Sequence, residues 1–155
     1  MTSAGFPGET AIPSSAPFLR ALEREVASHP AVNHPFLSRF AAETLSREQV
    51  LAFGFQHYQL VRVFTTYMTN LVAREPGWAA ALGGVFHDEY GRHTIFRSHA
   101  HLYRDFLRSA GAVDADWGRV ERTSETRAFI EAHLALTRDG DPLEALGAIG
   151  PGHEF

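Results

Sequence analysis

The residues of this chain that could do chemistry are ionisable side chains that fall on apolar helix faces. Glu89 comes four residues after Val85 and seven after Leu82, so in a helix it shares their inward face, whereas Asp88 does not. Burying an unpaired carboxylate is costly, which makes Glu89 a candidate metal ligand. The alternative interpretation is a partly exposed glutamate near the end of its helix.

His99 and Glu154 are the other two candidate ligands. His99 precedes Leu102 by three residues and Phe106 by seven and so shares their face, whereas His101 falls on the polar side. Glu154 takes an inward position if the Gly-Pro-Gly bend before it only kinks the last helix. Two inward carboxylates and an inward imidazole in a helical bundle match the ligand chemistry of non-haem iron or manganese.

Two further histidines leave alternatives open. His93 follows Glu89 by four residues, and this pair could bind a metal if the helix continues through Gly91. His57 lies within a long apolar stripe, and we interpret it as a core histidine satisfied by a hydrogen bond. Four aromatic residues could line a pocket, although core packing is the interpretation that we prefer for most of them: Phe53, Phe64, Tyr67 and Phe86.

The composition limits the chemistry to His, carboxylate, Tyr and Ser/Thr side chains. The 155 residues include no cysteine, which excludes disulfides, iron–sulfur clusters and thiolate zinc sites. All 14 basic residues are arginine, so lysine-based Schiff-base chemistry is also excluded. The net charge of −4 argues against nucleic-acid or anionic-membrane partners. With neither a secretory signal nor a long apolar run, a cytoplasmic location is expected.

The elements that must position these residues are helices, because the apolar spacing is helical and no strand is predicted. Residues 1–14 are predicted to be a flexible tail, and residues 15–155 to form one all-α bundle domain. Ser46, followed three residues later by Gln49, predicts a capping box. Helices are predicted from Pro17 to before Pro30, from His34 past Phe40, from Ser46 to about Arg74, from Pro76 to about Gly91, over 99–110, over 124–138, and from Pro142 onward.

At the candidate ligands and in several short motifs, the sequence resembles the heme-oxygenase-like diiron oxidases and oxygenases. This family contains iron-containing redox enzymes related to the chlamydial death-domain-associating protein. The resemblance covers nearly the whole chain after residue 14, and it depends on the order and spacing of short motifs. These motifs are Asn33–Leu37, Thr44–Gln49, Phe55–Tyr58, Asp88–Gly91, His99–Leu102 and Leu146–Ile149 followed by Glu154.

The resemblance implies a heme-oxygenase-like helical bundle and assigns Glu89, His99 and Glu154 as metal ligands. It further implies two iron ions, with manganese as an alternative, and O2-dependent oxidation of a small organic substrate, an amine or an amino-acid-like molecule. A homodimer is expected. Family members end in a core helix with a His-x-x-x-Asp-x-x-His motif, which is absent here, so the domain is expected to be incomplete. An exposed apolar groove is then predicted beside His57 and Phe64.

Other functions remain open from the sequence. One is a metal-free relative on the same scaffold, either a thiaminase-II-like hydrolase or a quinone-cofactor synthase. The absence of cysteine counts against the thiaminase, whose nucleophile is a cysteine. The other is a non-catalytic helical binding or dimerisation module, which is expected if the chain ends at Phe155, because three ligands alone cannot hold two irons.

Overall fold

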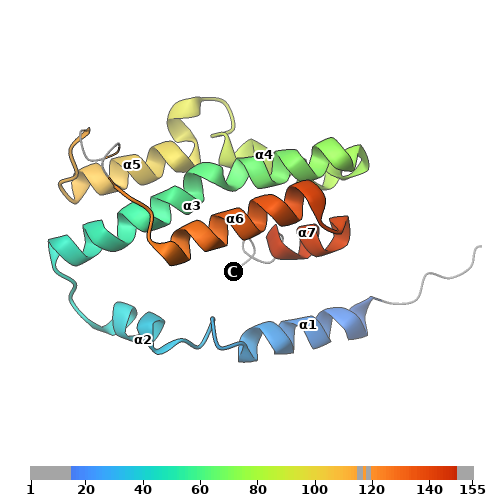
Figure 1. The fold of residues 1–155 in the computed structure, drawn as a ribbon, viewed down its shortest axis with the longest axis horizontal. Coiled ribbons are helices and arrows are strands. Elements are labelled where there is room, and N and C mark those ends of the chain that lie inside the picture. The colour runs from blue at the N-terminus through green and yellow to red at the C-terminus, as the bar shows by residue number, and fades with distance from the viewer. Residues whose placement is uncertain (1–14, 115–116, 118–119, 150–155) are drawn as a thin grey trace, which may run out of the picture. The chain divides into compact units, whose positions relative to one another are not determined.

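The structure is a computed structural model that describes residues 15–114, 117 and 120–149 (Figure 1). Within these residues it contains helices and no strand, which confirms the predicted all-α class. The predicted tail lies outside the described residues. The helices are α1 (Ala16–Ser28), α2 (Pro35–Ala42), α3 (Arg47–Arg74), α4 (Ala79–Glu89), α5 (His99–Ser109), α6 (Ser124–Asp139) and α7 (Pro142–Ile149), with 3-10 turns η1 (Pro76–Trp78) and η2 (Ile95–Arg97).

The chain divides into two compact units, residues 1–45 and 46–155. The described part of the first unit holds α1 and α2. The Nδ1 atom of His34 accepts a hydrogen bond from the backbone N–H of Phe36 at 3.1 Å and so caps the start of α2. Neither helix buries a side chain. The expectation of one domain beginning at residue 15 stays a prediction.

The second unit is organised around α3, and its start is fixed by the predicted capping box. The backbone N–H of Gln49 donates to the hydroxyl of Ser46 at 3.3 Å, and the side chain of Gln49 accepts from the Ser46 N–H at 2.8 Å. The helix then runs 28 residues to Arg74. It ends before Pro76, whose ring begins η1 and cannot continue the α-helical hydrogen bonding.

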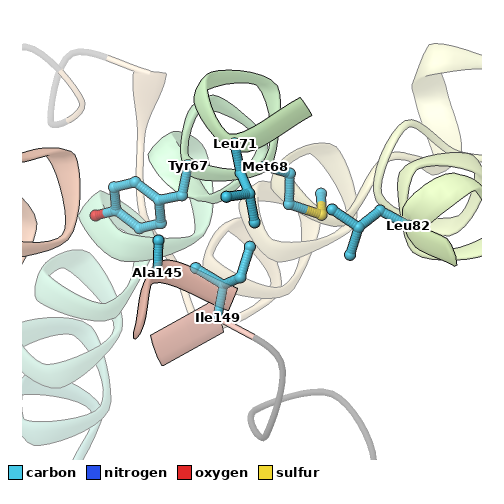
Figure 2. Close-up of a cluster of buried hydrophobic side chains, with 6 residues drawn as sticks. All are labelled: Tyr67, Met68, Leu71, Leu82, Ala145 and Ile149. Carbon is cyan, nitrogen blue, oxygen red and sulfur yellow. The ribbon is translucent and has the colours of Figure 1, made fainter. Parts of the chain in front are cut away.

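All four later α-helices pack on α3. In Figure 1, α4 and α5 follow one side of α3, whereas α6 and α7 follow the other. The main core cluster joins three residues of α3 to α4 and α7, and Figure 2 shows these side chains converging. Its buried members are Tyr67, Met68, Leu71, Leu82, Ala145 and Ile149.

Side chains of α3 also hold both ends of α6. The amide of Gln56 donates to the Glu121 carbonyl at 2.9 Å and accepts from the Thr123 N–H at 3.1 Å. At the other end, the guanidinium of Arg74 donates to the carbonyls of Thr137 at 3.1 Å and Gly140 at 2.6 Å. The bonds from Arg74 satisfy carbonyl groups that the C-terminal end of a helix leaves unpaired.

One face of α5 differs from the prediction. Leu107 is fully buried against α3, but Leu102 and Phe106 are each 48% exposed, so the expectation that they face the interior is wrong. Around the predicted groove, His57 and Phe64 are half-buried and Phe53 is exposed. The helical period defines which residues share a face, but packing on α3 decides which face is covered.

The close packing of α3 against α5 can be tested by adding a methyl group at their contact. A methyl group added at Gly54 would overlap the side chain of Leu107. We expect Gly54→Ala to lower the free energy of unfolding by about 1–3 kcal/mol through overpacking. The matched control is Gly83→Ala in α4, where a methyl group meets no neighbour within 4 Å. That control should stabilise the helix by about 0.5–1 kcal/mol. Urea denaturation followed by circular dichroism measures both, and equal stability of the two variants would contradict the packing.

Candidate metal centre

Glu89 is the last residue of α4 and is buried. It is 5% exposed and, as predicted, shares its helix face with Leu82, the other buried residue of α4. The neighbouring Asp88 points away from the core, because it forms an exposed ion pair with Arg92 at 2.7 Å. The helical spacing therefore separated the buried carboxylate from the solvated one correctly.

A tight turn after Glu89 ends α4 and begins the connection to α5. Gly91 has φ +85°, and a side chain there would collide with the backbone of Thr94, Arg97 and Ser98. The helix therefore ends before Gly91, and His93 does not continue it. The hydroxyl of Ser98 then accepts from the His101 N–H at 3.4 Å and caps α5, which makes His99 the first residue of that helix.

This turn brings Glu89 and His99 together. The Oε1 atom of Glu89 lies 2.7 Å from Nδ1 of His99, so the two candidate ligands lie side by side, although the expectation of an inward His99 is wrong because its helix face is exposed. The side chain of Glu89 is 5% exposed and that of His99 is 46% exposed, so the pair extends from the interior to the surface. His93 does not take this place, because its ring packs edge-to-face against His87 with 5.3 Å between centroids.

The exposed side of His99 borders an open pocket of about 580 Å³. Leu102 contributes an apolar wall, and Arg97 contributes a cationic group. The other lining residues belong to the end of α4 and the turn that follows it: Asp88, Gly91, Arg92, His93 and Thr94. A small molecule in this pocket would contact the imidazole of His99, whereas the Glu89 carboxylate lies behind it.

The donor atoms suit iron or manganese, which bind carboxylate oxygen and imidazole nitrogen. The described residues contain no group of three or more His, Asp or Glu side chains arranged to hold a metal ion. Glu154, the third predicted ligand, lies outside the described residues. The structure thus brings together two of the three predicted ligands.

The remaining candidates belong to the packing of the helices. His57 stacks on the ring of Phe53 with 5.7 Å between centroids and contacts the ring of Tyr103 in a tilted arrangement at 5.2 Å, and burial lowers the pKa of His57. Tyr67 is a core residue, and Phe64 and Phe86 pack around the same core, as we preferred for most of these aromatics.

Sequence reasoning missed a polar cluster between α3 and the segment before α6, in which Arg122 contacts the buried Gln59. No local signal could have found this contact, because the two residues lie 63 positions apart.

Comparison with known families identifies the chain. A family described as iron-containing redox enzymes matches residues 51–151, well over half of the sequence. The chain belongs to this family, whose fold is the heme-oxygenase-like all-α fold. The matched region includes Glu89 and His99. No curated protein matches the chain. Among the described helices, none has the length and apolar character needed to cross a membrane.

The requirement for glycine at position 91 can be tested by substitution. We expect Gly91→Ala to lower the free energy of unfolding by about 1–3 kcal/mol, because its φ is left-handed and the added methyl group would meet backbone atoms. The matched control is Arg92→Gly, since Arg92 also has a positive φ of 60° but makes only an exposed ion pair. That variant should stay within about 1 kcal/mol of the parent protein. Chemical denaturation measures both, and a tolerated Gly91→Ala would refute this account of the turn.

Proposed function

We propose that the protein is a non-haem diiron oxidase or oxygenase that uses O2 to oxidise a small organic substrate, an amine or an amino-acid-like molecule. The observation that carries the proposal is the buried Glu89 carboxylate 2.7 Å from His99, in a chain that belongs to a family of iron-containing redox enzymes. Glu154 is the proposed third ligand on the basis of the family resemblance. Manganese is the alternative metal.

The two side chains have different tasks in this proposal. Glu89 is buried, so its negative charge can offset the charge of a metal cation with little competition from water. His99 adds a nitrogen donor without adding negative charge, and its exposed side faces the pocket from which a substrate can approach. Bound iron would supply the chemistry by which O2 accepts electrons from the substrate.

The dependence of O2 consumption on iron distinguishes this function from the two alternatives, a metal-free relative and a non-catalytic module. Chelated protein should consume O2 in the presence of candidate amines only after anaerobic loading with Fe(II), and an oxygen electrode measures that rate. A metal-free relative would act on its substrate without iron, and a non-catalytic module would neither retain iron nor consume O2. Either result would refute the diiron proposal.

Glu89→Ala should abolish iron retention while the protein stays folded, because the main apolar core is centred on other residues of α3, α4 and α7. Losing one buried charged ligand should weaken metal binding by at least about tenfold. The matched control is Asp88→Ala, which removes an adjacent but exposed carboxylate and should retain iron. Iron is counted by a colorimetric assay after desalting, and circular dichroism reports the fold. Equal iron content in the two variants would exclude Glu89 as a ligand.

A further inference from the structure

A second polar site lies between α3 and the segment that leads into α6. Its centre is the side-chain oxygen of Gln59, a residue that is 4% exposed. Two guanidinium groups approach this oxygen: Nη1 of Arg62 and Nε of Arg122 each lie 3.4 Å from Oε1. Arg62 is exposed and Arg122 is half-buried, so the site can be reached from solvent.

The positive charge of this site is not neutralised within the described residues. Neither Arg62 nor Arg122 forms an ion pair there, whereas four other arginines pair with a neighbouring acid: Arg39, Arg92, Arg108 and Arg138. The contacts with Gln59 are also long for N–H···O hydrogen bonds, which are typically about 2.7–3.2 Å. Two like charges therefore share one neutral acceptor, and both retain N–H groups for a further partner.

Tyr67 provides a third donor. It is 2% exposed, and its hydroxyl has no hydrogen-bond partner among the described residues. Burial raises the pKa of Tyr67 to about 12, while the nearby charge of Arg122 acts in the opposite direction. The hydroxyl thus keeps its proton at neutral pH. A buried hydroxyl without a partner is costly, so an acceptor that reached it would be stabilising.

The backbone around Arg122 is fixed before any ligand arrives. Gln56 accepts from the Thr123 N–H and donates to the Glu121 carbonyl, so it binds α3 to the residues on both sides of Arg122. Gln59 lies one helical turn further along α3. Such preorganisation reduces the entropy that binding would otherwise cost.

From this geometry we infer a binding site for the carboxylate group of a small organic molecule, formed by Arg62 and Arg122 with the Tyr67 hydroxyl as an additional donor. A carboxylate offers two oxygens in one plane, which matches the planar fork of a guanidinium group. Val63 follows Gln59 by four residues, so it shares that face of α3, and as a partly buried apolar side chain it offers a surface for an organic body. The site needs no metal and does not depend on the proposed oxidase function.

Benzoate is the probe, and benzamide is its uncharged control of similar shape. At constant ionic strength, benzoate should shift the arginine Nε–H signals of the full chain in a saturable manner in 1H–15N NMR spectra, and benzamide should not. Arg122→Gln and Arg62→Gln should each weaken benzoate binding by at least about tenfold, because each removes a charge-assisted hydrogen bond. The exposed Arg127, which makes no ion pair among the described residues, gives the matched control Arg127→Gln with unchanged affinity.

Tyr67→Phe distinguishes a binding role from a structural one. Removing an unpartnered buried hydroxyl should raise the melting temperature of the free protein, yet it should weaken benzoate binding several-fold. The inference is overturned if benzoate gives no saturable shift, if Arg122→Gln binds it as well as the parent protein does, or if inorganic phosphate binds at least as tightly as benzoate.

Discussion

The packing of every later α-helix on α3 is the constraint from which the rest of the second unit follows. The capping box at Ser46 fixes where α3 begins, and the close approach of Leu107 to Gly54 sets how near α5 can come. The helix α4 packs beside the C-terminal part of α3, whereas α5 packs beside its N-terminal part, where Arg47 donates to the carbonyls of Ala110 and Gly111. The two helices therefore follow α3 one after the other in the same direction. The Gly91 turn loops the chain out between them, so that the end of α4 meets the start of α5 with Glu89 beside His99.

The features that could be predicted from the sequence are those encoded locally. Ser46 and Gln49 define a helix start through their own side-chain hydrogen bonds, and Gly91 ends α4 because its conformation requires glycine. The position of Glu89 relative to Leu82 likewise needs only the helical period. The inward face of Glu89 was predicted correctly, whereas His99 lies beside it although the α5 face that His99 shares with Leu102 and Phe106 is exposed. The role of the pair as metal ligands stays a prediction.

The features that could not be predicted depend on which neighbour covers a face. The stripe of Leu102 and Phe106 is a correct helical face, yet α5 turns Leu107 toward α3 and leaves that stripe exposed. Similarly, Arg122 has no helical period to place it, and its contact with Gln59 accompanies the hydrogen bonds by which Gln56 holds the backbone on either side of it. The periodicity of a sequence predicts the faces of one helix at a time, whereas these contacts depend on how two segments of the chain pack against each other.

The two polar sites of the second unit use opposite chemistry. Glu89 and His99 come from α4 and α5 and present lone pairs, which suit a cation. Arg122 precedes α6, and with Arg62 of α3 it presents N–H donors, which suit an anion. The carboxylate of Glu89 contacts His99 of α5, whereas Arg62 and Arg122 both contact Gln59 of α3. A cation and an anion would therefore be recognised at different helix contacts of the same unit: the cation where α4 meets α5, and the anion where α3 meets the segment before α6.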